Sequence, residues 1–535
     1  MLSVAELNLG SIDAVNYKTK SEREFFSKII YKENYLSDIL ERKKYFLIGE
    51  KGTGKSSYAV FLHNSEYQST LSRAVSLSQT DYRRFISLQE MGKFNISSYV
   101  DIWKVILLLL VSDGISNRFK ERAFQFSKFK KLKSAIDQYY SSSYRPEVDQ
   151  SLDIVENSER AASIISEHIR AEAAQKTEIS QSFSSIQVNL AYLERSFKDA
   201  ISSLRLSSDF ILFIDGIDIR PDQIEYSSYI ECIKGLANAA WELNTEFFAN
   251  IKDSQRGMKV VLLMRPDILD EMGFQNLNAK VRDNGVNLDW LTTYEGFKTS
   301  PIFNLVSGTL KNQQDSGNST KLEVWDHYFP YKTENMRVAE QLDNPFVAFL
   351  RYSFYRPRDI IQYMQFMQEY IKKSEDEKFV FSRESFYKSQ AIFSDYLLGE
   401  VKDYLNFYHS TSNFDDLVGF FSEWGGNKEI SWDNFKTAFH RYRSSLGSRE
   451  ITVKELTSSP EDLLQLLYSL NILGYVEPAD QGRGFVHYCF RDRSTVKLRP
   501  KVRHGFSYPV HPGLQRALLV GGSEREGHDR GLRRN

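Results

Sequence analysis

The stretch at residues 49–56 reads Gly49-Glu50-Lys51-Gly52-Thr53-Gly54-Lys55-Ser56. It matches the pattern G-x-x-x-x-G-K-[ST] at every fixed position. The apolar run Tyr45–Ile48 before it is typical of a strand, and Ser57–Leu62 after it can continue as a helix. Glycines let the backbone curve so that successive N–H groups point at phosphate oxygens, and the helix N-terminus adds its positive dipole. The stretch therefore predicts a phosphate-binding loop between a strand and a helix.

This loop supplies the predicted nucleotide-binding residues. Lys55 would reach the β- and γ-phosphates of a nucleoside triphosphate, and the Ser56 hydroxyl would hold Mg²⁺. An ordinary glycine-rich turn is the alternative, but the correct flanks on both sides argue against it. The predicted nucleotide-binding residues are Gly49, Glu50, Lys51, Gly52, Thr53, Gly54, Lys55, Ser56 and Ser57.

A second candidate element is an apolar strand that ends in a carboxylate. Residues Phe210–Asp215 are apolar up to the final aspartate, and Asp218 follows after Gly216. An acid at the carboxyl end of a strand beside such a loop can bind Mg²⁺ through water, so Ser56 and Asp215 are the predicted metal ligands. Asp218 could polarise the attacking water as a general base. The alternative is that Asp215 caps its strand and Asp218 begins a turn.

A third candidate element is the strand Lys259–Met264, which is followed by Arg265-Pro266-Asp267. Parallel strands end at one edge of a sheet, so Arg265 would point into the same crevice and could sense the γ-phosphate. Its guanidinium would stabilise charge on the transferring group. The alternative is a salt bridge from Arg265 to a nearby acid such as Asp267 or Asp270.

Composition describes an ordinary globular protein. The chain has 535 residues, 41% hydrophobic and 26% charged, with a net charge of −1, so any nucleic-acid binding must come from a local patch. Cys232 and Cys489 lack metal-ligand spacing and fit a reducing compartment. The first residues show no signal-peptide pattern, and the longest aliphatic run, Val105–Val111, is too short to cross a bilayer. We expect a cytoplasmic protein without membrane contact, with that run buried in a helix.

The order of elements predicts an α/β fold with a parallel sheet. A strand is expected near Arg84–Leu88, and further strands are expected at Asp209–Asp215 and Lys259–Met264, separated by a helix over Tyr229–Phe248. The polar, Ser- and Glu-rich stretch 116–207 reads as a helical insertion between the loop and the acidic strand.

The C-terminal third has a different texture. Helices are expected at Ser431–Tyr442 and Leu463–Asn471, followed by a two-stranded ribbon formed by Gly474–Val476 and Gly484–Phe490. Helices followed by such a ribbon suggest a winged-helix domain. The last residues lack apolar content and are expected to be disordered. The predicted domains are a P-loop domain (1–310, insertion about 116–207), a helical lid (311–410), a winged-helix-like domain (411–505) and a tail (506–535).

Together these motifs resemble a known family. The loop, the Asp-Gly-x-Asp ending of Phe210–Asp218, and Met264-Arg265-Pro266 look like the STAND branch of AAA+-related P-loop ATPases. The resemblance implies a P-loop NTPase fold with an ASCE-type parallel sheet, ATP and Mg²⁺ as ligands, and ATP hydrolysis. Arg356-Pro357-Arg358-Asp359 begins an apolar helix and looks like the lid arginine called sensor 2, with Arg358 the first choice and Arg356 the second. The predicted catalytic residues are Asp218, Arg265 and Arg358.

The resemblance also frames the functional classes. The chain is similar to stand-alone bacterial ATPases, some of which occur in phage-defence or DNA-maintenance loci. It departs from the family in lacking a C-terminal repeat array and in the long interval between Lys55 and Asp215. Neither a guanine-binding Asn-Lys-x-Asp loop nor an ABC signature is present, so ATP is preferred over GTP. An ATP-driven switch or motor leads, with an ATP-dependent homo-oligomer that regulates a protein effector as the alternative.

Two local surfaces leave DNA as a possible binding partner. The segment Arg118–Lys133 interleaves cations with phenylalanines, as strand-binding surfaces do, although an amphipathic helix with core phenylalanines explains it equally well. A second set of cations lies on or after the expected ribbon and could grip a phosphate backbone. The expected recognition helix Pro460–Leu470, however, carries the acidic residues Glu461 and Asp462 and no basic residue. The second set consists of Arg483, Arg491, Arg493, Lys497, Arg499, Lys501 and Arg503.

Overall fold

The computed structural model describes residues 1–90, 99–119, 127–139, 147–170, 186–252, 256–273, 276–314, 318–333, 343–373, 378–409, 413–447, 451, 453–479, 484–494 and 496–521. The chain divides into two compact units, which are described separately. The sheet unit contains Lys32–Gly49 and Lys55–Leu288, and the C-terminal unit contains Met1–Tyr31, Glu50–Gly54 and Asp289–Asn535. The five loop residues Glu50–Gly54 therefore group with the C-terminal unit, although they are covalently joined to the sheet unit on both sides.

The sheet unit is an α/β structure with five parallel strands in the order β2-β3-β4-β1-β5. The loop strand β1 and the acid-ending strand β3 are separated by β4, which is buried along its whole length. Continuous burial of β-branched and aliphatic residues is what a parallel sheet covered on both faces requires. The strands are β1 (Phe46–Ile48), β2 (Thr70–Ser76), β3 (Asp209–Asp215), β4 (Met258–Met264) and β5 (Gly285–Asn287).

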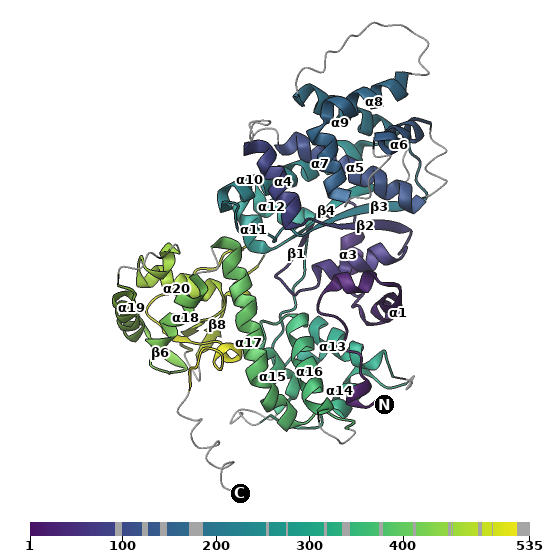
Figure 1. The fold of residues 1–535 in the computed structure, drawn as a ribbon. Coiled ribbons are helices and arrows are strands. Elements are labelled where there is room, and N and C mark those ends of the chain that lie inside the picture. Colours follow the sequence, from purple (N-terminus) through teal and green to yellow (C-terminus); the bar gives the residue numbers. More distant parts are fainter. Residues whose placement is uncertain are drawn as a thin grey trace. The chain divides into compact units, whose positions relative to one another are not determined.

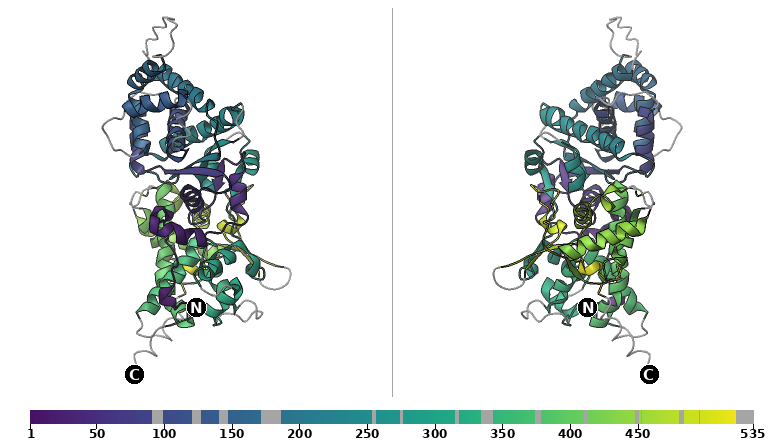
Figure 2. Two further views of the ribbon diagram at one scale, coloured as in Figure 1. Left: turned by 90° about the vertical axis from the view of Figure 1, so that its right-hand side faces the viewer. Right: turned by 90° about the vertical axis from the view of Figure 1, so that its left-hand side faces the viewer.

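Helices cover both faces of this sheet. Figures 1 and 2 show α3 on one side and α5 and α10 on the other. The aliphatic run Val105–Val111 lies inside α5 and is buried, as the sequence predicted. No helix in the described part of the chain is both long and apolar enough to cross a bilayer. The helices of this unit are α2 (Tyr35–Leu40), α3 (Lys55–Asn64), α4 (Gln79–Glu90), α5 (Tyr99–Phe119), α6 (Ser127–Tyr139), α7 (Glu147–Glu156), α8 (Ser158–Arg170), α9 (Ile186–Ser202), α10 (Tyr226–Glu242), α11 (Pro266–Glu271) and α12 (Leu277–Asn284).

One predicted strand is wrong. Arg84–Leu88 belongs to α4, in which Tyr82, Phe85 and Ile86 are buried at helical spacing. The edge strand that pairs with β3 is instead β2, whose register places Ser76 opposite Asp215. The strand β2 is difficult to predict from the sequence, because polar residues such as Ser72 interrupt its apolar pattern although they are buried in the structure.

The C-terminal unit contains an aromatic-rich set of helices. Trp325 packs edge to face against Phe346, and Tyr363 stacks on Phe386, so rings fill the space between helices. Residues Ser353–Arg356 separate α15 from α16. The helices are α1 (Lys20–Ile29), α13 (Pro301–Lys311), α14 (Lys321–Tyr328), α15 (Pro345–Tyr352), α16 (Pro357–Lys372) and α17 (Arg383–Tyr408).

The same unit carries a small antiparallel sheet in the order β6-β9-β7-β8. The predicted ribbon is present as the antiparallel pair β7–β8, and β9 joins it to β6. The end of the tail, predicted to be disordered, lies outside the described residues from 522 onward. The elements are α18 (Asn413–Gly419), β6 (Glu429–Ser431), α19 (Trp432–Leu446), α20 (Pro460–Ser469), β7 (Tyr475–Glu477), β8 (Phe485–His487), α21 (Cys489–Asp492) and β9 (Ser507–Pro509).

Candidate functional site

The candidate site begins at the carboxyl edge of the parallel sheet. Ile48 pairs with Met264 and Ile214 pairs with Leu262, so β1, β3 and β4 end within about one residue of the same level. The N–H of Gly49 donates to the carbonyl oxygen of Met264 at 3.1 Å. In open α/β sheets this edge is where ligands bind.

Lys55 and Ser56 stand at the start of α3, directly after the loop. The Lys55 side chain is 8% exposed, and its Nζ donates to the Gly49 carbonyl oxygen at 2.7 Å. The amine is therefore folded back over its own loop. The first N–H groups of an α-helix have no partner within the helix, so the start of α3 favours an anion.

The two predicted metal ligands meet in the structure. The Ser56 hydroxyl donates a hydrogen bond to the Asp215 carboxylate, and the Gly216 N–H donates to Asp215 Oδ1 at 2.8 Å. Burial raises the pKa of Asp215, and the neighbouring Asp218 charge raises it further, although Ser56, Gly216 and Lys55 act in the opposite direction. We call Lys55, Ser56, Asp215 and Asp218 the sheet-edge cluster.

Asp218 is held by a turn that only glycine permits. Gly216 has a φ of +79°, and a Cβ there would collide with the Leu77 carbonyl oxygen. Tyr82 donates its hydroxyl to the Gly216 carbonyl oxygen at 3.3 Å, and Tyr229 donates to that of Ile217 at 2.7 Å. Two buried tyrosines thus fix the backbone between the two aspartates.

Arg265 forms the salt bridge that the sequence indicated as the alternative to a phosphate contact. Its side chain is 3% exposed and forms an ion pair with Asp267, with Nε to Oδ1 at 3.0 Å. Asp267 is itself buried and lies in the first turn of α11. A contact from Arg265 to a γ-phosphate would need this buried pair to open.

The middle of the loop adopts conformations that require glycine. Gly52 and Gly54 have φ values of +86° and +97°. Thr53 closes the turn, with its N–H and its hydroxyl both donating to the Glu50 carbonyl oxygen, at 3.3 and 2.8 Å. The indole N–H of Trp290 donates to the Thr53 carbonyl oxygen at 2.9 Å. These hydrogen bonds fix the carbonyl oxygens of Glu50 and Thr53 within the loop.

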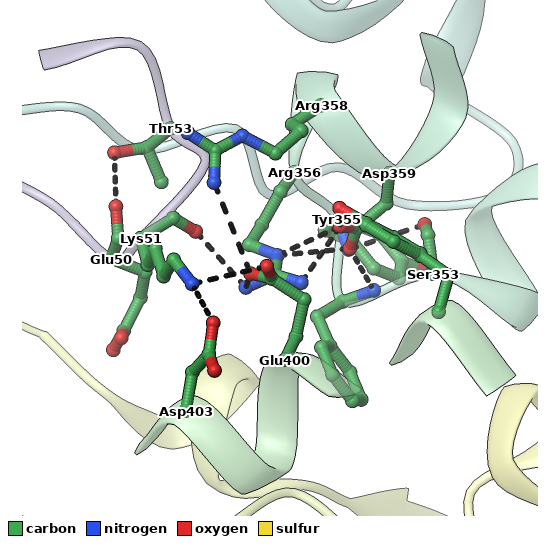
Figure 3. A network of polar contacts seen from close by, with 12 residues as sticks. Glu50, Lys51, Thr53, Ser353, Tyr355, Arg356, Arg358, Asp359, Glu400 and Asp403 are labelled. Carbon is green, nitrogen blue, oxygen red and sulfur yellow. Dashed lines mark hydrogen bonds and ion pairs between the residues drawn. The ribbon is translucent and has the colours of Figure 1, made fainter. Parts of the chain in front are cut away.

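Arg356 and Arg358 contact this part of the loop from the start of α16. Figure 3 shows both side chains beside Lys51. Arg356 Nη1 donates to the Lys51 carbonyl oxygen at 3.0 Å, and the Arg358 N–H donates to that of Gly52 at 3.4 Å. A Cβ on Gly52 would lie 3.2 Å from the Arg358 Cβ. Arg358, the predicted lid arginine, is thus adjacent to the loop.

Carboxylates from two helices neutralise these cations. Asp359 accepts from Arg356 Nη2 at 2.7 Å and is fully buried. Glu400 of α17 lies 3.1 Å from Lys51 Nζ, 3.4 Å from Arg356 and 3.9 Å from Arg358. Asp403 binds Lys51 at 2.6 Å. We call Lys51, Arg356, Arg358, Asp359, Glu400 and Asp403 the loop clamp.

Burial and charge act against each other in the loop clamp. Burial alone would lower the pKa of Arg356, but Asp359 and Glu400 outweigh it and raise that pKa. Burial alone would raise the pKa of Glu400, but Arg356, Lys51 and Arg358 outweigh it and lower that pKa. Both shifts favour the ionised forms of Arg356 and Glu400.

Sequence reasoning missed Glu400, Asp403 and Trp290. No motif marks them, and Glu400 and Asp403 are two of the four acids on the long helix α17, with nothing in their spacing to single them out. Lys51 stands at a variable position of the loop pattern, so its salt bridges had no signal in the spacing either.

Several residues of the predicted nucleic-acid-binding surfaces are buried or make contacts within the protein. Phe119 and Phe129 are buried, so they are not available to stack on bases, and Arg118 Nε donates to the Ser72 carbonyl oxygen at 3.0 Å. Arg491 donates to the Tyr294 hydroxyl at 3.1 Å, and Arg493 forms an ion pair with Glu50. Arg483 lies outside the described residues.

The donor set of the sheet-edge cluster suits a hard cation. A hydroxyl and a carboxylate are oxygen ligands of the kind that Mg²⁺ takes together with phosphate and water. Within the described residues, no group of three or more His, Cys, Asp or Glu side chains could hold a metal ion on its own. No protein-family model matches the chain, and no curated protein matches it.

Proposed function

We propose that this chain binds a nucleoside triphosphate with Mg²⁺ through the loop Gly49–Ser57 and hydrolyses it. The observation that carries the proposal is the contact between Ser56, which follows the loop lysine, and Asp215, which ends β3 at the same edge of a parallel sheet. The separation of β1 and β3 by one strand fits the ASCE-type sheet that the sequence resembles. ATP is the proposed substrate, because the chain lacks a guanine-binding loop.

Each residue has a defined part in this proposal. Loop N–H groups and the start of α3 bind phosphate oxygens, and Lys55 exchanges its hydrogen bond to the Gly49 carbonyl oxygen for one to the β/γ-phosphates. Ser56 and Asp215 hold Mg²⁺, which when bound neutralises charge on the β- and γ-phosphate oxygens. Asp215 must be ionised for this, although its environment raises its pKa.

Asp218 is the proposed general base. The Gly216 turn and the two buried tyrosines fix its backbone, so its carboxylate has a defined position relative to Asp215. It would accept a proton from the attacking water as the bond to the γ-phosphorus forms. Arg358 would stabilise charge on the transferred group from its place beside Gly52.

Nucleotide binding and turnover by three variants test the proposal. Lys55→Ala should weaken binding of ATP with Mg²⁺ by about 2–4 kcal/mol, because it removes a charge that contacts phosphate. Asp218→Asn should bind normally and lose roughly 100-fold or more in turnover. The exposed Lys130 of α6 provides the control, and Lys130→Ala should match the wild type. Full turnover by Asp218→Asn would remove Asp218 from catalysis, and equal binding by Lys55→Ala would overturn the site.

One observation favours nucleic acid as the partner of this ATPase. Exposed cations alternate with buried residues over 497–503, so the cations share one face of the segment. Gln465 of α20 anchors that segment through the Pro500 carbonyl oxygen and the Val502 N–H, at 3.2 and 3.0 Å. The ion pair between Glu477 and Arg503, at 2.6 Å, counts against nucleic-acid binding by this face. The exposed cations are Lys497, Arg499, Lys501 and Arg503.

Salt-dependent binding of DNA separates the two functional classes. A DNA-acting switch or motor should bind single- or double-stranded DNA, and Lys497→Gln with Lys501→Gln should reduce the salt slope by about 0.7–0.9 per lost contact. ATP-dependent assembly without DNA binding would instead favour the oligomerising ATPase that regulates a protein effector. Sizing with and without ATP and Mg²⁺ measures that assembly.

A further inference from the structure

Glu400 has an environment that few single carboxylates have. It lies in the middle of α17, its side chain is 11% exposed, and it is within 4 Å of three cations. Two of those cations, Lys51 and Arg358, belong to or lie beside the phosphate-binding loop. Figure 3 shows the Glu400 side chain pointing between them.

The other carboxylates of the loop clamp have different tasks. Asp359 is committed to Arg356, because it accepts from Nε and Nη2 of that guanidinium and from the Phe354 N–H at 3.0 Å. Asp403 contacts Lys51 alone among these cations, and its side chain is 60% exposed. Glu400 is thus the anion that Lys51 and Arg358 share.

The contact to Arg358 is the weakest in the clamp. At 3.9 Å it is an ion pair without a hydrogen bond, and the Arg358 side chain is 26% exposed. Arg356, in contrast, is 9% exposed and binds both Asp359 and the loop carbonyl of Lys51. Arg358 can therefore change partner at little cost, whereas Arg356 cannot.

We propose that Glu400 is a positioning residue that competes with phosphate for two cations: it holds Lys51 and Arg358 beside the loop until the triphosphate takes them over. This inference rests on the proposed nucleotide site. A triphosphate on the loop brings several negative charges to the same cations, and Coulomb repulsion from Glu400 opposes its entry. Glu400 sets how tightly the nucleotide binds, and the exchange gives the loop two alternative anionic partners.

Removal of the Glu400 charge should tighten nucleotide binding. We expect Glu400→Gln to lower the Kd for ATP with Mg²⁺ by about 5- to 20-fold, because the competing charge is lost while the side-chain shape is kept. KM should fall and kcat should change less than about twofold, because Glu400 acts on binding and not on the reacting atoms. Asp395→Asn removes an equal charge from an exposed position of the same helix outside the loop clamp, and it should change Kd by about twofold or less.

A double-mutant cycle tests the route through Arg358. In an Arg358→Gln background, Glu400→Gln should lower the Kd by clearly less than it does in the wild type, because one of the two shared cations is gone and only Lys51 remains beside Glu400. An unchanged or higher Kd in Glu400→Gln, or a full gain in the Arg358→Gln background, would overturn the inference. If Glu400→Gln fails to fold, Glu400→Asp serves instead, since its shorter side chain keeps the charge and moves it away from Arg358. Absence of ATP binding in the folded wild type, by contrast, would refute the proposed function itself.

Discussion

The carboxylates of the sheet-edge cluster and of the loop clamp lie in opposite electrostatic environments. The pKa of Asp215 is raised, because burial and Asp218 outweigh Ser56, Gly216 and Lys55. The pKa of Glu400 is lowered, because three cations outweigh its burial. An ionised carboxylate whose charge is not fully neutralised by its neighbours is stabilised when a divalent cation binds. A carboxylate that is already neutralised must be displaced from its cations before another anion can bind them. The first cluster is therefore suited to accept Mg²⁺, and the second to exchange one anion for another.

The largest effect on stability should appear when the buried carboxylate of the loop clamp is neutralised. Asp359→Asn should destabilise the protein by about 3–5 kcal/mol, because it leaves the buried Arg356 guanidinium without its main partner. The exposed Asp403 provides the matched control within the same clamp, and Asp403→Asn should cost about 1 kcal/mol or less. Urea unfolding of both variants measures the free energies. Equal losses would show that the clamp does not depend on the buried pair.

Acid should separate the two clusters in order. Asp215 has a raised pKa, so it takes up its proton first as pH falls, and Mg²⁺-dependent ATP affinity should drop by up to about tenfold per pH unit below that pKa. Glu400 has a lowered pKa, so the stability it contributes is present above its unfolded pKa of 4.5 and is lost only as pH falls through the lower folded value.

Titrations of ATP affinity and of unfolding from neutral pH to well below the unfolded pKa of Glu400, 4.5, check this order. The Asp215→Asn variant gives the part of the affinity change that comes from the nucleotide's own titration. If the loss of affinity in the wild type follows the variant at every pH, Asp215 does not hold the metal. If the stability that Glu400 contributes is lost at a higher pH than the ATP affinity, the assignment of the two electrostatic environments is reversed.

Local pattern explains which parts of this comparison the sequence could predict. Strand, loop and helix around Lys55 follow from contiguous residues, and the acid that ends β3 follows from an apolar run with a single charge. The strand predicted near Arg84–Leu88 lies inside the helix α4, because five residues are too few to distinguish a helical period from a strand period. Glu400 could not be found, because the contact with Lys51 depends on the path of the chain between them and leaves no spacing to detect.

The smallest predicted effect has the opposite sign from the largest. Asp215→Asn should stabilise the nucleotide-free protein by on the order of 1 kcal/mol, as functional residues often do when they are neutralised. The sign follows from linkage: a raised folded pKa favours folding below the unfolded pKa of 3.8, and this is lost as pH rises, so at neutral pH the charge opposes folding. Asparagine can still accept the Gly216 N–H hydrogen bond.

The same variant should lose the stabilisation that the ligand provides. Thermal unfolding with and without ATP and Mg²⁺ measures both effects in one experiment, because a ligand that binds the folded state raises Tm in proportion to its affinity. The wild type should gain from the ligand, and Asp215→Asn should start higher and gain little. A lower starting Tm, or an equal gain from the ligand, would mean that Asp215 is a structural carboxylate like Asp359, and the contrast between the two clusters would fail at the residue on which the metal site depends.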